Sequence, residues 1–126
     1  MVTAMRSFVI HAHSGHGPLH YDLMLEQGQA LATWRLPCPP HVLATGTSME
    51  ALKIQDHRRA YLEYEGPVSN QRGRVARTDS GQYEVLDRSD ARWAIRLLGR
   101  RARGRFELTV QNAASGRWSL TRVGED

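Results

Sequence analysis

The regular spacing of short β-strand-like segments constrains the fold of this chain more than any other feature. Most segments alternate apolar and polar side chains, and glycine, proline, asparagine or aspartate separates each from the next. Many short strands at near-even spacing favour an antiparallel barrel or sandwich, mostly β with little helix, over a βαβ fold. The predicted strands are residues 7–13, 19–26, 30–36, 60–64, 73–77, 82–86, 92–98, 104–110 and 117–123.

The connections between these segments are predicted from their turn residues. Residues 27–29 (QGQ) read as a tight turn that makes a hairpin of the two flanking segments. Residues 56–59 (DHRR) and 78–81 (TDSG) are also predicted to be turns. Residues 48–54 (SMEALKI) allow either a helical turn capped by Ser48 or a direct lead into a strand over residues 51–55.

Length and composition indicate one ordinary globular domain over residues 1–126. The sequence contains no repeat, linker or apolar run of about 18 residues, so we expect no membrane span. The N-terminal residues lack the features of a secretory signal, and a cytoplasmic protein is expected. Cys38 is the single cysteine, which excludes an internal disulfide and a CxxC zinc site. The three tryptophans lie in strand-like runs and are expected in the core.

The basic residues are almost all arginine. Sixteen of the seventeen are Arg, the exception being Lys53, and the formal net charge is +4. The planar guanidinium group suits bidentate contacts with phosphate. A high genomic G+C content also enriches arginine, so the composition allows a phosphate-bearing partner without requiring one.

A histidine-rich stretch, HAHSGHGPLHYD at residues 11–22, is the first candidate site. His20, Asp22 and Met24 share one face of a strand by its two-residue period, and His13 ends the preceding strand. If the intervening loop folds back, two imidazoles and a carboxylate converge, a set that suits Mn²⁺, Fe²⁺ or Zn²⁺ with open coordination positions. The alternative is a solvated histidine-rich turn in which Asp22 serves as a cap or an ion-pair partner.

A second polar patch, QDHRRAY at residues 55–61, combines a histidine, two arginines and a tyrosine. His57, Arg58, Arg59 and Tyr61 could bind a phosphate and protonate a leaving oxygen. The alternative is an ordinary polar turn.

Together, the ordered motifs resemble the 3′-phosphoesterase domain found at the N-terminus of bacterial DNA ligase D and in free-standing proteins. The resemblance runs over nearly the whole chain, and the order of several short motifs is more specific than any one of them. The motifs that carry it here are FVIHAHSGHGPLHYDLMLE, LATWRLP, QDHRRAYLEYEG, RGRFELTV and RWSLTRV.

The resemblance implies a compact antiparallel β-barrel enzyme that removes a 3′-phosphate or a terminal 3′-ribonucleotide during DNA repair. It implies a divalent metal, most typically Mn²⁺ with Zn²⁺, Co²⁺ or Fe²⁺ as alternatives, and the residues that match the family's metal ligands are His13, His20 and Asp22. His57 and Tyr61 match the residues that act around the scissile phosphate. The expected partners are DNA or RNA-tailed DNA 3′ ends and a ligase or polymerase of end joining, with the protein a monomer.

The chain departs from the family pattern at several positions. The loop between the two ligand histidines is one residue longer, so His11 or His16 could replace His13, and His11 is otherwise expected to support the ligands from behind. Met24 stands where the family has a phosphate-binding arginine, and Gln55 where it has a glutamate near the site. The candidate replacements for the missing guanidinium are Arg58, Arg59 and Arg72.

Two other functions stay open at this point. A DNA-end-binding module without turnover would explain the departures from the pattern. A small non-haem iron oxygenase would use His20, Asp22 and His57 as a two-histidine, one-carboxylate set.

Overall fold

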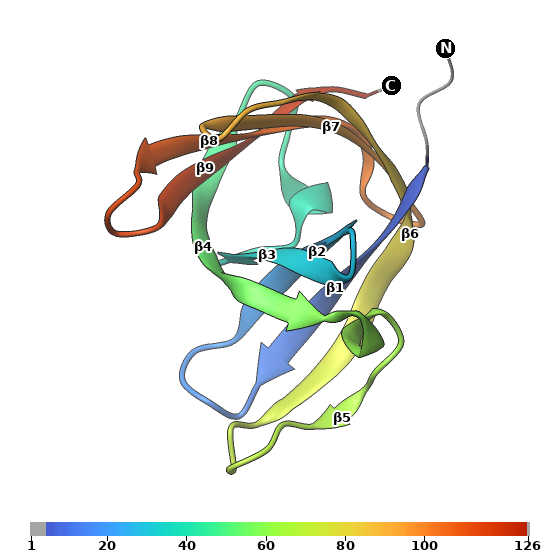
Figure 1. Ribbon diagram of the computed structural model, residues 1–126, viewed down its shortest axis with the longest axis vertical. Helices are drawn as coiled ribbons and strands as arrows, with labels where there is room; N and C mark the ends of the chain where they lie inside the picture. The colour runs from blue at the N-terminus through green and yellow to red at the C-terminus, as the bar shows by residue number, and fades with distance from the viewer. Residues whose placement is uncertain (1–4, 126) are drawn as a thin grey trace.

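The computed structural model describes residues 5–125 and is an antiparallel β-barrel closed by eight strands (Figure 1). The strands follow the order β1-β2-β3-β4-β9-β8-β7-β6, and pairing of β1 with β6 closes the barrel. The prediction of a mostly β barrel with little helix is confirmed, whereas the ends of the predicted domain, residues 1–4 and 126, lie outside the described residues. The bounds are β1 Arg6–Ser14, β2 His20–Gln27, β3 Ala30–Leu36, β4 Ser48–Arg58, β6 Arg74–Arg88, β7 Arg92–Gly99, β8 Arg103–Asn112 and β9 Arg117–Gly124.

Three short elements complete the fold. The two-residue strand β5 (Gly66–Pro67) pairs with one end of β6, outside the closed barrel. The 3₁₀ helix η1 spans Pro40–Val42, and the 3₁₀ helix η2 spans Arg59–Leu62 between β4 and β5. Neither of these helices, nor any other in residues 5–125, has the length and apolar character needed to cross a bilayer.

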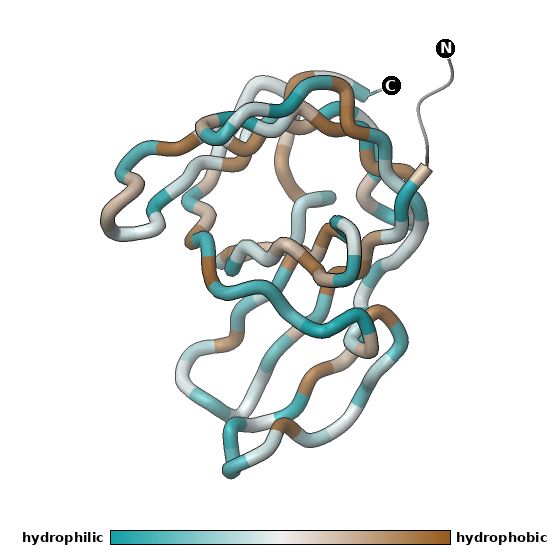
Figure 2. The backbone as a smooth tube through the Cα atoms, in the orientation of Figure 1, coloured by the Kyte–Doolittle hydropathy of each residue, from teal (hydrophilic) through white to brown (hydrophobic). Residues whose placement is uncertain are grey.

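The main core lies inside the barrel, because alternate residues of each strand point inward. Ile10, Leu23 and Trp34 lie on three adjacent strands and are fully buried in this core. Figure 2 shows the resulting alternation of hydrophobic and hydrophilic residues along the strands. The three tryptophans are buried as predicted, and the ring of Trp34 makes edge contacts with Trp93 and Trp118 at 5.3 and 5.4 Å between centroids.

A second, smaller apolar cluster lies on the outer face of the same strands. Val9, Met24 and Leu31 are buried there, although their side chains point away from the main core. Tyr61 and Leu62 of η2 pack against them and cover this part of the outer face. The cluster therefore fixes η2 beside the outward-facing residues of β1 and β2, which include the histidines of the candidate site.

Three predictions of local structure are wrong: the strand over residues 60–64 and the turns over residues 56–59 and 78–81. Residues 60–64 do not form a strand, because η2 turns Tyr61 and Leu62 toward the same cluster, whereas a strand would place them on opposite faces. Residues 56–58 extend β4 and do not form a turn. Of the two alternatives for residues 48–54, the strand is the correct one, because these residues all belong to β4. The PCPP sequence around Cys38 predicts a buried or partly buried thiol in a loop, but Cys38 is exposed in the β3–β4 connection.

The predicted turn TDSG is instead the middle of the long strand β6. Asp79 accepts hydrogen bonds from the backbone N–H groups of Arg100, Arg101 and Ala102 at 2.8, 3.2 and 2.7 Å and so holds the β7–β8 turn. A Cβ at Gly81 would lie 2.4 Å from the carbonyl oxygen of Leu98. These turn-forming residue types thus serve tertiary contacts within a strand.

Candidate active site

His13, His20 and Asp22 converge at the open end of the β1–β2 hairpin. His13 ends β1 opposite His20, the first residue of β2, and Asp22 follows on the same face. One ligand atom from each lies within 4.8 Å of the others, and all three residues are buried. Asp22 Oδ2 lies 4.0 Å from His13 Nδ1, and Asp22 Oδ1 lies 3.8 Å from His20 Nε2. The structure therefore brings together the three predicted metal ligands.

Backbone carbonyl groups orient both imidazoles. His13 Nε2 donates a hydrogen bond to the carbonyl oxygen of Arg72 at 2.6 Å, and His20 Nδ1 donates to that of Pro18 at 3.1 Å. A carbonyl oxygen only accepts, so the proton of each neutral ring lies on the bonded nitrogen. The other nitrogen, which faces Asp22, keeps its lone pair. Burial lowers the pKa of His20, which favours the neutral, metal-binding form of the ring.

The donor atoms of this group fit a divalent metal ion. Among the described residues, His20 Nε2 and Asp22 Oδ1 are buried and have no hydrogen-bond partner. Leaving such an atom unsatisfied costs about 1–3 kcal/mol. A cation between them would satisfy both atoms with the nitrogen and oxygen ligands that Mn²⁺, Fe²⁺, Co²⁺ and Zn²⁺ accept.

The group opens into a cleft of about 610 Å³ that also receives residues of the second predicted patch. Gln55, His57, Arg58 and Tyr61 line it, together with Ile54. A bulge in β4 makes this possible: Ile54 pairs with Thr33, and His57 pairs with Leu31, so one extra residue lies in β4. Without the bulge, side chains three residues apart would point to opposite faces of the strand.

Tyr61 lies between two histidines of the cleft. Its ring centroid is 5.5 Å from that of His57 and 6.1 Å from that of His11, both in edge geometry. His57 Nδ1 donates to the carbonyl oxygen of Gln55 at 3.0 Å, which leaves Nε2 as the unprotonated nitrogen of the neutral ring. The two residues predicted to act on the phosphate are thus adjacent.

His11 is fully buried beneath Tyr61. Neither of its ring nitrogens has a hydrogen-bond partner among the described residues. Burial, followed by the positive charges of His57 and Arg77, lowers the pKa of His11 to about 4. His11 lies outside the metal group, as does His16, which is exposed and stacks on His13 with 6.2 Å between ring centroids. The oxygenase alternative would use His20, Asp22 and His57 as metal ligands, but the residues that converge are His13, His20 and Asp22.

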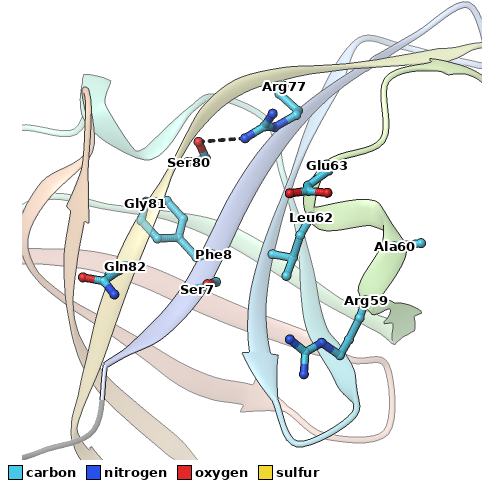
Figure 3. Close-up of a pocket in the computed structure, with 10 residues that line it drawn as sticks. All are labelled: Ser7, Phe8, Arg59, Ala60, Leu62, Glu63, Arg77, Ser80, Gly81 and Gln82. Atoms are coloured by element: carbon cyan, nitrogen blue, oxygen red, sulfur yellow. Dashed lines mark hydrogen bonds between the residues drawn. The ribbon is translucent and has the colours of Figure 1, made fainter.

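The predicted phosphate-binding arginines occupy different environments. Arg58 and Arg72 line the cleft, and Arg72 Nε donates to the carbonyl oxygen of Ser69 at 2.8 Å. Arg59 lines a separate pocket of about 550 Å³ between η2, β1 and β6 (Figure 3). Its guanidinium forms an ion pair with Glu26 at 2.5 Å. The structure does not bring Arg59 to the candidate site.

Arg35 is a cleft residue that sequence reasoning missed. It lines the cleft from β3, and its Nε atom lies 3.7 Å from Asp22 Oδ1. Met24, at the position of the family arginine, is only 1% exposed and belongs to the apolar cluster on which Tyr61 packs. The signal that could have identified Arg35 is the hairpin register: if Gln27 pairs with Ala30 across the turn, Asp22 must pair with Arg35.

One family model matches most of the chain. Residues 10–110 match the family model described as the DNA ligase D 3′-phosphoesterase domain. The matched range includes every candidate residue named above. No curated protein matches the chain.

Proposed function

Because this chain belongs to the DNA ligase D 3′-phosphoesterase domain family, we propose that it is a metal-dependent hydrolase of phosphoesters at the 3′ ends of DNA. It removes a 3′-phosphate or a terminal 3′-ribonucleotide, in DNA repair and in the cytoplasm. The observation that carries this proposal is the convergence of His13, His20 and Asp22 on the cleft that contains His57 and Tyr61. Two buried ligand atoms of this group have no hydrogen-bond partner within residues 5–125.

The residues of the cleft divide the work as follows. His13, His20 and Asp22 hold the metal, for which Mn²⁺ is our first choice. A divalent cation in such a site polarises phosphate oxygens and lowers the pKa of a water molecule. In its imidazolium form, in which Nε2 also carries a proton, His57 donates that proton to the leaving oxygen or stabilises charge on the phosphoryl group. Tyr61, fixed by its packing on the cluster of Val9, Met24 and Leu31, orients the phosphate.

The assay is a primer–template duplex whose primer ends in a 3′-phosphate or a single 3′-ribonucleotide, incubated with Mn²⁺. We expect trimming to a 3′-hydroxyl by the wild type and none after addition of a chelator. Asp22→Asn should abolish trimming, because it removes the only carboxylate of the metal group. Asp56→Asn is the matched control, since Asp56 lines the same cleft but is 59% exposed and pairs with Lys53.

The proposal fails if the wild type produces no 3′-hydroxyl with any of Mn²⁺, Zn²⁺, Co²⁺ or Fe²⁺, or if Asp22→Asn is as active as Asp56→Asn. Tight binding to the 3′-phosphorylated duplex without turnover would instead indicate a DNA-end-binding module. A ligase or polymerase that requires the 3′-hydroxyl is the expected consumer of the product, and the protein is expected to act as a monomer.

A further inference from the structure

Arg35 lies beside the candidate metal site. It extends from β3 on the same face as Asp22, its partner on β2, and lines the cleft. Although 42% of the side chain is exposed, its Nε atom is buried and has no hydrogen-bond partner among the described residues. At 3.7 Å from Asp22 Oδ1, Nε is an ion-pair neighbour of that carboxylate and not a hydrogen-bond donor to it.

The charged side chains around the cleft include too few carboxylates to balance both Arg35 and a divalent cation. The charged side chains that line it are three arginines and two aspartates, and one of the aspartates, Asp56, is paired with Lys53 at 3.6 Å. A divalent cation held by Asp22 would therefore share its one carboxylate with the guanidinium of Arg35. The single negative charge of Asp22 does not balance the three positive charges of a divalent cation and a guanidinium, so the two cations still repel each other unless a further anion lies close to both.

A terminal phosphate is the anion that fits. A phosphomonoester carries close to two negative charges at neutral pH and three terminal oxygens, whereas a phosphodiester linkage carries one charge and two such oxygens. The other two cleft arginines are less well placed: Arg72 Nε is bonded to Ser69, and Arg58 is exposed at the end of β4. Arg35 is thus the guanidinium that lies beside the metal-binding carboxylate.

We propose that Arg35 binds the terminal oxygens of a 3′-phosphate, so that the cleft selects 3′-phosphomonoesters over internal phosphodiesters. The inference rests on the proposed function, because it takes the phosphoryl group at the metal site as the substrate. Arg35 is a binding residue here, and its guanidinium acts on charge and orientation without taking part in proton transfer.

Binding to two duplexes provides the test. One ends in a non-hydrolysable 3′-methylenephosphonate, which retains the two negative charges, and the other ends in a 3′-hydroxyl; affinities are measured by fluorescence anisotropy with Mn²⁺ present. Wild type should prefer the phosphonate by about 10- to 100-fold, the range expected for a charge-assisted contact. Arg35→Gln should lose most of this preference, and Arg35→Lys should retain part of it, because lysine keeps the charge without the fork.

Arg100→Gln is the matched control, because it removes the same charge from the exposed β7–β8 turn, and it should retain the preference. Mn²⁺ affinity, measured by calorimetry, should be at least as high in Arg35→Gln as in wild type. The inference is overturned if Arg35→Gln keeps the phosphonate preference, or if it loses the preference together with Mn²⁺ affinity, which would assign Arg35 a structural role in the metal site. Absence of wild-type hydrolysis with the phosphonate preference intact would count against the proposed function and not against this one.

Discussion

Asp22 and Arg35 are paired across the β2–β3 hairpin, and Arg35 Nε lies 3.7 Å from Asp22 Oδ1. The pairing follows from the tight turn at Gly28 and Gln29, because each step back along β2 is matched by one step forward along β3. A change in the length of this turn would therefore separate the guanidinium from the metal-binding carboxylate without altering either residue.

Gly73→Ala should weaken metal binding. Gly73 has a φ of +81°, and a Cβ there would lie 2.0 Å from the carbonyl oxygen of Ser14. The loop must then move, and it carries the Arg72 carbonyl that orients His13. Loss of such a supporting hydrogen bond lowers metal affinity about 10- to 100-fold, which calorimetry with Mn²⁺ measures. Gly17→Ala is the control, with a φ of +72° and no atom within 4 Å of its Cβ; equal affinities in the two variants would refute the prediction.

Met24→Ala should destabilise the fold. Met24 is 1% exposed in the cluster that supports Tyr61 and Leu62, and truncation of a buried methionine to alanine costs about 2–5 kcal/mol. Met24→Leu preserves the volume and should cost less than about 1.5 kcal/mol. Urea unfolding of both variants provides the measurement. If Met24→Leu also lost Mn²⁺ affinity, the thioether would have a role in the site beyond packing.

His11 should remain neutral well below pH 6. Its pKa is lowered from 6.5 in the unfolded chain to about 4 in the native state, chiefly by burial. The unfolded state therefore takes up the proton first, and the contribution of His11 to stability is fully present above pH 6.5 and falls as the pH drops toward 4. At 1.36 kcal/mol per pH unit the loss approaches about 3 kcal/mol. The measurement is the free energy of unfolding of wild type and of His11→Gln between pH 4 and pH 6.5. If the two proteins lost the same free energy over this range, the prediction would be wrong.

Asp79→Ala should unfold the protein more readily than any change at an exposed carboxylate. Asp79 is 5% exposed and accepts backbone hydrogen bonds from Ser80 and from three residues of the β7–β8 turn. Removing the carboxylate leaves these donors without it, at a cost of about 3 kcal/mol or more. Asp87→Ala, which breaks an exposed ion pair with Arg92, should cost less than about 1 kcal/mol. Similar midpoints in thermal unfolding would show that Asp79 does not hold the turn.

Arg58 and Arg59 should differ in DNA binding. Arg58→Ala should reduce the slope of log K against log salt concentration by about 0.9, because one phosphate contact is lost. Arg59→Ala should leave the slope unchanged, because Arg59 is paired with Glu26 outside the cleft. Anisotropy titrations at several salt concentrations measure both slopes. An equal loss in the two variants would place the DNA path across both pockets.

The sequence predicted those parts of the site that depend on one strand at a time. The two-residue period put His20, Asp22 and Met24 on one face, and the loop after His13 allowed the hairpin that brings His13 to them. The barrel followed from the spacing of strands and the family motifs together.

What the sequence did not reveal depends on contacts between distant segments. The residues of TDSG are typical of a turn. In the structure, however, Asp79 accepts hydrogen bonds from the β7–β8 turn, and Gly81 lies close to the backbone of β7. Residues 60–64 have strand-forming side chains, but η2 forms because Tyr61 and Leu62 both pack on the outer cluster. Arg35 could be identified only from the register between β2 and β3, which cannot be read from the sequence of either strand alone.

The core and the candidate site share the strands β1 and β2. Along each strand, alternate residues point into the core, and the residues between them point toward the outer face that carries the site. Leu23 faces the interior while Asp22 and Met24 face outward. A substitution at an outward position can thus change the residues of the candidate site and leave the core intact. The activity can therefore diverge while the barrel fold is kept. Deletion of one residue within β2 would have the opposite effect, because every later side chain would exchange faces. Within these strands we therefore expect natural variants to differ by replacement and almost never by length.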